Sequence, residues 1–402
     1  MSYYQSYKKI RKPWVMGLSN FIYDSMNNMN YNKKKEKKKN NNFYAGNGDY
    51  YDFNSENDDN EGYTDIFYND NYQKNNGSNL CFMNSSIQCL SHLISFREWI
   101  INFSTNKGNK NLLMETKKLF EEMKNENYPL KSNVLGIKKV MSEVDERYKY
   151  NNQEDANEFI SIFLDELLEE TKCGLETKEN KTFKNKIEED AYNKIWRKFY
   201  SKKGGSFLVP LFYGLLKTEK KCDGCDGIIS IDFNTFNMLE LSIYKYKNLE
   251  SVKLETILSD FYGKKLVNKN KQYCNICKNE TTNYNITTIY SLPKYLIIYF
   301  GRTIDNKYIN LNIEYEETLK LSIDSYPQDN YYFSYLKNLF VNQKSYKLQG
   351  IIEHFGNNES GHYTSICLIK DKYWYHFNDD IYEPSNIDYK SGNAFILLYK
   401  LN

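Results

Sequence analysis

Two Cys-x-x-Cys pairs constrain the folding of this chain more than any other feature of its sequence. They lie in KCDGC (221–225) and YCNIC (273–277), and 48 residues (226–273) separate the second cysteine of the first pair from the first cysteine of the second. Four thiolates can close a tetrahedron around one metal ion, and a tetrahedron with no open position is a structural site. We therefore expect one zinc ion held by four ligands: Cys222, Cys225, Cys274 and Cys277. Iron in the same thiolate set, redox pairs, two local disulfides and coincidence are the alternatives.

The composition favours an intracellular protein, in the cytoplasm, the nucleus or both. Residues 1–20 contain no apolar core of the length that a secretory signal needs, and no later run approaches the ~18 apolar residues of a membrane span. In a reducing compartment, patterned cysteines among the eight present are better explained by metal binding or catalysis than by disulfides. The 54 Lys and Arg nearly balance the 52 Asp and Glu, so charge predicts no nucleic-acid partner. We expect a monomer without an organic cofactor.

The first 72 residues differ in composition from the rest of the chain. The tract YNKKKEKKKNNN (31–42) and the Asn- and Asp-rich stretch 47–60 contain too few aliphatic side chains to offset the entropy of ordering them. We expect residues 1–72 to form a disordered arm. Its lysine run (33–39) is either an import signal or a product of biased composition.

From residue 73 onward, helical patterns come first and strand-like runs follow. A helix that opens at Cys81 would place Ile87, Leu90 and Ile94 on one face, and QEDANEFISIFLDELL (153–168) repeats apolar residues at helical spacing. A charged segment (178–204) is also expected to be helical. Strand-like runs lie at 229–243, 295–300, 363–369, 373–377 and 394–399. This order of elements predicts an α+β fold.

Cys81 at the start of a helix could be a nucleophile. The unpaired N–H groups and the positive end of the helix dipole favour the thiolate form of a cysteine at this position. Asn76, on the preceding loop, could donate a hydrogen bond to an oxyanion beside the sulfur. A small buried cysteine and an asparagine of no special role are the alternatives.

His362 is the best candidate for a base that would serve such a nucleophile. It follows Gly361 at the mouth of a strand-like run, where a side chain can be held rigidly, although His354 is a competing candidate. A Cys/His pair needs a third group to fix the imidazole, and Asn378 and Asp379 end the next strand-like run. Asn and Asp are also ordinary turn residues.

Six collinear segments resemble motifs of the ubiquitin-specific protease family, also called ubiquitin carboxyl-terminal hydrolases, which are papain-like cysteine peptidases. The resemblance covers about residues 73–401. The segments are NNGSNLCFMNSSIQCL, NQEDANEFISIFLDEL, LFYGLLKTEKKCDGC, SLPKYLIIYFGRT, YKLQGIIEHFGNNESGHYTS and WYHFNDD.

This resemblance implies an α+β papain-like fold with a helical thumb (about 73–205), zinc-bearing fingers (within 206–300) and a β-rich palm (about 300–401). It implies ubiquitin and ubiquitinated proteins as partners, and hydrolysis after the C-terminal Gly of ubiquitin through a thioester. The implied catalytic roles are nucleophile for Cys81, general base and acid for His362, orienting group for Asn378 with Asp379 beside it, and oxyanion donor for Asn76.

The resemblance also assigns Gln153, Asp155 and Glu158 to the ubiquitin tail. Asp155 and Glu158 share a helix face and could pair with tail arginines, whereas the plain alternative is an N-capping Asp with a solvated Glu. The loop before Cys81 departs from the family pattern at four positions, which are Gln73, Lys74, Ser78 and Leu80. Two other functions therefore stay open: a ubiquitin-binding scaffold without turnover, and an isopeptidase for another ubiquitin-like modifier.

Overall fold

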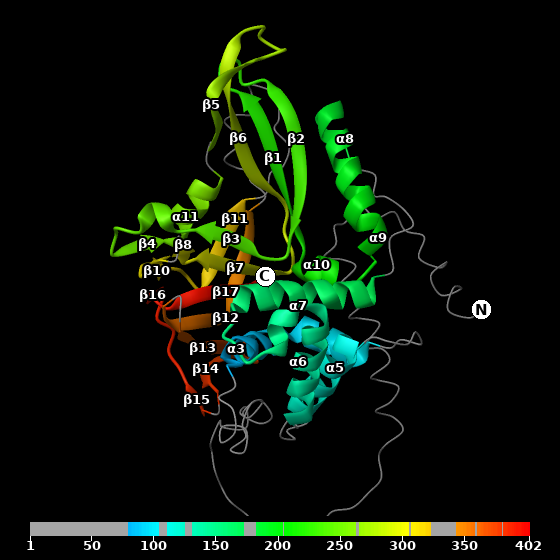
Figure 1. Cartoon of the computed structure of the whole chain (residues 1–402), viewed down its shortest axis with the longest axis vertical. Coiled ribbons are helices and arrows are strands. Elements are labelled where there is room, and N and C mark those ends of the chain that lie inside the picture. Colours follow the sequence, from blue (N-terminus) through cyan, green and yellow to red (C-terminus); the bar gives the residue numbers. More distant parts are fainter. Residues whose placement is uncertain are drawn as a thin grey trace, which may run out of the picture. The chain divides into compact units, whose positions relative to one another are not determined.

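The computed structural model describes most of the chain after residue 78 (Figure 1). The described residues are 79–103, 111–124, 131–172, 182–203, 205–262, 265–304, 307–322, 343–357, 360–379 and 381–402. The predicted arm (1–72) and Asn76 therefore lie outside the described residues. Within those ranges, no helix has the length and apolar character needed to cross a bilayer.

The first half of the described chain is helical, as predicted. Its helices are α3 (Cys81–Ser91), α4 (Ile94–Asn102), α5 (Asn111–Lys124), α6 (Lys131–Val144), the short η3 (Glu146–Lys149) and α7 (Ala156–Thr171). The apolar stripe predicted on α7 is confirmed, because Phe159, Phe163 and Leu167 are fully buried. The expected continuation of the first helix to Ile94 is wrong. That helix ends at Ser91, and Ile94 begins α4 with 39% of its surface exposed.

The charged segment after α7 is helical in part. It contains α8 (Lys186–Ile195), the π-helical turn η4 (Trp196–Tyr200) and the short α9 (Ser201–Lys203). The side chain of Asn185 caps α8 by accepting a 2.9 Å hydrogen bond from the Glu188 N–H. The apolar face of α8 and η4 packs on β2 through a small aromatic cluster, and α10 (Leu208–Phe212) follows.

A four-stranded antiparallel sheet contains the Cys-x-x-Cys motifs, and its strand order is β2-β1-β6-β5 (Figure 1). The strands are β1 (Gly214–Cys222), β2 (Ile228–Phe236), β5 (Lys265–Tyr273) and β6 (Glu280–Ser291). The single strand-like run expected at 229–243 is in fact two strands in different sheets, since β2 ends at Phe236 and β3 (Leu239–Ser242) joins the larger sheet. The break falls at Asn237, whose side chain accepts a 3.2 Å hydrogen bond from the Ser161 hydroxyl.

An eight-stranded sheet forms the second half of the molecule. Its order is β15-β14-β13-β12-β17-β7-β3, with β11 paired to one end of β12. The strands are β3, β7 (Tyr295–Gly301), β11 (Thr318–Ser322), β12 (Gln343–Gly356), β13 (Gly361–Ile369), β14 (Tyr373–Asn378), β15 (Ile381–Pro384) and β17 (Ala394–Leu401). Smaller elements are η5 (Tyr244–Tyr246), α11 (Leu254–Phe261), a sheet of β4 (Ser251–Lys253), β10 (Asn312–Glu314) and β16 (Lys390–Ser391), and the pair β8 (Thr303–Ile304) and β9 (Lys307–Tyr308). The thumb, finger and palm limits stay a prediction.

Helix α3 packs directly on the large sheet, against β12 and β13. A glycine makes this close approach possible, because a Cβ added at Gly350 of β12 would lie 3.0 Å from the Sγ of Cys89 on α3. Cys89 in turn lies 3.6 Å, sulfur to sulfur, from the buried Cys367 of β13. The packing therefore sets the helix that begins at Cys81 beside the strand that carries His362.

Candidate active site and metal centre

Cys81 is the first residue of α3 and is 9% exposed. Leu80 occupies the N-cap position and provides no side-chain hydrogen bond, and the first turn contains no acidic residue. The positive end of the helix dipole is therefore not neutralised by the residues of the helix itself. The position matches the one predicted from the sequence.

His362 lies near the start of β13 and is fixed by the end of β14. Antiparallel pairing sets Ser365 opposite Phe377, so that Asn378 reaches back toward the imidazole. The Nε2–H of His362 donates a 2.7 Å hydrogen bond to Oδ1 of Asn378. Since Nε2 is engaged in this way, Nδ1 is the ring nitrogen that can meet the sulfur.

The side chain of Cys81 is the largest influence on the charge of the His362 imidazole. The interaction with Cys81, the bond to Asn378 and the negative charge of Asp379 raise the pKa of His362 to about 9, against the opposing effect of partial burial. The imidazole is therefore influenced by the sulfur on one side and held by Asn378 on the other. A histidine with this pKa is charged at neutral pH and can act as a proton donor.

Asp379 is close to His362 without a direct hydrogen bond. Its Oδ2 lies 3.7 Å from Nε2 of His362, and its Oδ1 accepts a 3.4 Å hydrogen bond from the Asn84 side chain on α3. The backbone of Asp379 is left-handed, with φ of 51°. Asp379 thus connects the cysteine helix to the turn after β14.

His354, the competing candidate, is a packing residue. Its ring lies 4.5 Å from the ring of Tyr363, and its Nδ1 lies 3.4 Å from the hydroxyl of Tyr308. Burial lowers the pKa of His354 and keeps the ring neutral.

The three residues assigned to the ubiquitin tail contact other parts of the chain. Gln153 pairs with the backbone of Gly361 through two hydrogen bonds. Asp155 makes no capping hydrogen bond to α7, so the N-cap alternative is wrong; its Oδ1 instead accepts a 3.0 Å hydrogen bond from the Tyr363 hydroxyl.

Glu158, on the first turn of α7, forms an ion pair with Arg147 of η3. The Glu158 side chain is 44% exposed, so this pair lies at the surface. Glu158 is therefore solvent-exposed, as the plain alternative has it, but it is paired with Arg147.

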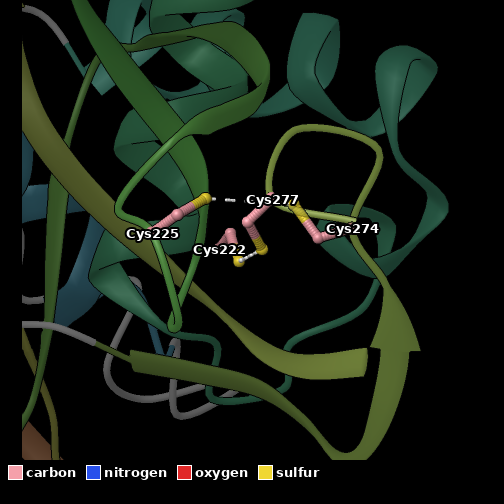
Figure 2. A group of neighbouring side chains, drawn as sticks. All are labelled: Cys222, Cys225, Cys274 and Cys277. Atoms are coloured by element: carbon pink, nitrogen blue, oxygen red, sulfur yellow. Dashed lines mark hydrogen bonds between the residues drawn. The ribbon is translucent and has the colours of Figure 1, made fainter. Parts of the chain in front are cut away.

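The four cysteines of the Cys-x-x-Cys pairs come together at the end of the four-stranded sheet (Figure 2). Their sulfur atoms lie within 4.8 Å of one another. The Sγ atoms of Cys222 and Cys277 are 3.8 Å apart, and those of Cys225 and Cys274 are 4.0 Å apart. Zn–S bonds of about 2.3 Å give tetrahedral S–S edges of about 3.8 Å, so this donor set fits a four-thiolate metal ion.

Both cysteine loops have the same backbone design. Asp226 and Lys278 have left-handed backbones, with φ of 56° and 60°. Each is the fourth residue after the first cysteine of its pair. Each donates its N–H over 2.9 Å to the carbonyl of that first cysteine. The two loops therefore form matching turns, and each turn contributes two of the four clustered thiols.

The sequence profile described as "Ubiquitin carboxyl-terminal hydrolase" matches residues 73–399. The chain belongs to the ubiquitin carboxyl-terminal hydrolase family. This membership confirms the resemblance drawn from the six motifs.

Among curated ubiquitin carboxyl-terminal hydrolases, the chain is 28% identical over 336 residues to Usp2 of Drosophila melanogaster and 26% identical over 339 residues to ubiquitin carboxyl-terminal hydrolase 2 of Homo sapiens. Each match covers 81% of this chain, but only 34% and 54% of the respective relative. The chain thus spans about a third to a half of the length of these two relatives.

Solved structures show that the fold is shared. The structure of the SAGA Ubp8/Sgf11/Sus1/Sgf73 DUB module bound to ubiquitin aldehyde matches with a TM-score of 0.62 at 20% identity, over 81% of this chain and 68% of that chain. The same module bound to monoubiquitin matches with a TM-score of 0.61 at 19% identity, over the same shares of the two chains. The predicted α+β fold of the ubiquitin-specific protease type is confirmed.

From the sequence of this hydrolase family member we missed three residues that contact the predicted site residues. They are Asn84, Arg147 and Tyr363. Tyr363 follows His362 directly, so its place in the strand was a usable signal. Arg147 lies in DERYKY, where nothing in the spacing points to Glu158.

Proposed function

We propose that this family member is a deubiquitinating thiol protease that hydrolyses the isopeptide or peptide bond after the C-terminal Gly of ubiquitin. The observation that carries the proposal is the imidazole of His362, which is hydrogen-bonded to Asn378 and has its pKa raised by the side chain of Cys81 at the start of α3. A sulfur at a helix start, an imidazole and an orienting amide are the parts that acyl transfer by a cysteine requires.

In the proposed acylation step, the Cys81 sulfur attacks the carbonyl carbon of the ubiquitin Gly. The carbon–nitrogen bond breaks, and the leaving lysine amine takes the proton from Nδ1 of His362. A thioester joins Cys81 to ubiquitin, and the imidazole is left neutral.

Water completes the cycle in the second step. The neutral His362 takes a proton from water, the resulting hydroxide attacks the thioester carbonyl, and the carbon–sulfur bond breaks. Ubiquitin leaves with a free carboxyl group, and the starting forms of Cys81 and His362 return. The Cys81 N–H at the start of α3 is suited to stabilise the oxyanion of both steps. Asn76, as a second donor, stays a prediction because it lies outside the described residues.

Asp155 and Glu158 are proposed to meet the arginines of the ubiquitin tail. Both lie at the start of α7, and a carboxylate pairs well with a guanidinium. Glu158 would first have to exchange Arg147 for the incoming arginine. Binding would therefore replace one ion pair with another and not create a wholly new one.

The metal proposed for the four-cysteine site is zinc, with one ion per chain. Four thiolates leave no coordination position for water or substrate, so the ion would hold the two cysteine loops together and take no part in the chemistry. The residues that would hold it are Cys222, Cys225, Cys274 and Cys277. Location in the cytoplasm or nucleus and a monomeric state are further predictions.

The test is to mix the protein with ubiquitin that carries an electrophile at its C-terminus and to map the adduct by mass spectrometry. We expect labelling at Cys81, no labelling in Cys81→Ala, and slower labelling in His362→Ala. Labelling at other cysteines with none at Cys81 would overturn the proposal.

A parallel reaction with the same electrophile on other ubiquitin-like modifiers tests the choice of modifier. Binding of di-ubiquitin without cleavage, by a protein that retains its metal, would instead support the scaffold function.

A further inference from the structure

The two residues that flank His362 are both held by the loop before α7. The side-chain Nε2 of Gln153 donates a 2.9 Å hydrogen bond to the Gly361 carbonyl, and its Oε1 accepts a 3.0 Å hydrogen bond from the Gly361 N–H. On the other side of His362, the Tyr363 hydroxyl donates to Asp155. Two residues of one loop therefore hold two residues of one strand, and the imidazole lies between them.

We propose that Gln153 is a positioning residue for His362, which it fixes by pairing its amide with the backbone of Gly361. This proposal rests on the proposed function, because it concerns the general base of that reaction. It also departs from the role in ubiquitin-tail binding that the sequence resemblance implied for Gln153.

Strand β13 has a partner strand on only one side at this point. β12 pairs with Gly361 and His362, whereas the pairing with β14 ends at Ser365 with Phe377. The N–H and C=O of one strand residue point in the same direction and seek a neighbouring strand. The Gln153 amide offers one donor and one acceptor in a plane, and it takes the place of the missing neighbour.

A primary amide suits this task better than the other side chains of similar length. A carboxylate at position 153 would accept from the Gly361 N–H but would face the Gly361 carbonyl with a second acceptor, and a thioether would pair with neither group. Loss of the two bonds leaves the end of β13 that leads into His362 held by β12 alone. Displacement of a catalytic group by about 1 Å can cost about 100-fold in rate.

The experiment compares Gln153→Met, which keeps the length of the side chain, with Gln153→Glu, which keeps only the acceptor. Asn152→Ala, at the exposed neighbouring position, is the matched control. The first readout needs no substrate: the chain has four histidines, so selective labelling with 13C-histidine allows each ring to be titrated by NMR. His362→Ala assigns the signal.

We expect the pKa of His362, about 9 in the parent protein, to fall toward 6.5 in Gln153→Met as the ring leaves Cys81, and to stay in place in Asn152→Ala. The second readout is the kinetics of ubiquitin cleavage. We expect kcat to fall about 10- to 100-fold with KM within about twofold of the parent. Gln153→Glu, with one bond left, should lie between the parent and Gln153→Met in kcat.

The proposal is overturned if the Gln153 variants raise KM and leave both kcat and the His362 titration unchanged, since that pattern belongs to a residue that binds the ubiquitin tail. Thermal unfolding is measured first, and Gln153→Glu replaces Gln153→Met if the latter does not fold. Failure of the parent protein to cleave ubiquitin would sink the proposed function alone, because the titration without substrate still decides whether Gln153 positions the ring.

Discussion

His362 donates a 2.7 Å hydrogen bond from Nε2 to the side-chain carbonyl of Asn378. The acceptor is a neutral amide, so it orients the imidazole without neutralising the charge that the ring carries. The nearest carboxylate is that of Asp379, at 3.7 Å from the same nitrogen. Two adjacent residues therefore supply the orienting amide and a negative charge.

Removal of Asn378 should cost far more activity than removal of Asp379. We expect Asn378→Ala to lower kcat about 100-fold or more, since the general acid and base loses its orientation. Asp379→Ala should cost at most about fivefold, because a pair whose partners are about 40% exposed is worth no more than ~1 kcal/mol. Asn378→Asp keeps an acceptor and is the control. Equal losses in the two alanine variants would contradict the separation of roles.

The pH dependence of kcat/KM should show an alkaline limb near pH 9. The pKa of His362 is raised from 6.5 to about 9, chiefly by the side chain of Cys81, so the proton needed by the leaving amine is present below pH 9 and lost above it. Charged His362 likewise stabilises the folded state fully below pH 6.5, and that stability is lost as the pH rises through 9. A limb near pH 6.5 would mean that the Cys81 contact does not form in solution.

Each chain should contain about one zinc ion, and removal of the metal should destabilise the four-stranded sheet. Cys274→Ser is expected to reduce zinc measured by elemental mass spectrometry and to lower the thermal unfolding midpoint, because a structural zinc site contributes directly to folding. Cys89→Ala, outside the cluster, should retain the metal. A Cys274→Ser protein with unchanged metal content and stability would exclude a zinc site at these four cysteines.

Loss of Arg147 should improve ubiquitin binding. Arg147→Met frees Glu158, and the exposed ion pair that it removes is worth up to ~1 kcal/mol. We expect KM for ubiquitin substrates to fall by up to about fivefold with kcat unchanged, whereas Arg147→Lys should behave like the parent. Glu158→Gln should raise KM. If KM rises in Arg147→Met, Arg147 supports the site and does not compete for it.

Gly361→Ala should destabilise the protein and disturb His362. A Cβ at this position would overlap the ring of His354, and overpacking of this kind costs ~1 to 3 kcal/mol in unfolding free energy. Gly301→Ala is the control, since its Cβ would meet other atoms only at 3.8 Å and beyond. Both are compared by chemical denaturation. The double variant Gly361→Ala, His354→Ala should recover part of the loss, and no recovery would place the strain elsewhere.

Elements whose pattern is local were predictable from the sequence. The α7 stripe and the strands β7, β13, β14 and β17 follow from apolar periodicity within each segment. The strand β1 was not among the predicted strand-like runs because GLLKTEKKC is mostly polar. None of its residues is exposed, and its buried Lys217 is paired with Glu188 and Glu219 instead of facing water. The division of 229–243 between two sheets was missed because one apolar run gives no sign of a change of partner.

In the candidate site too, the sequence predicted local motifs but not contacts between distant segments. Cys81, His362 and the four cysteines occur in motifs that can be read from the sequence, and their positions agree with that reading. The partners of Gln153, Asp155 and Glu158 are contacts between distant segments. No periodicity within a single segment records such contacts, so the partners of these three residues could be identified only from the structure.

Strand β17 has a consequence for biosynthesis. It pairs with β12 on one side and with β7 on the other. Because its residues follow those of β7 and β12 in the sequence, it is translated after both of these neighbours. Until residues 394–401 have left the ribosomal exit tunnel, β7 and β12 lack this shared partner, and an unpaired strand edge is a template for association with other chains. The sheet that carries His362 is completed only after that point.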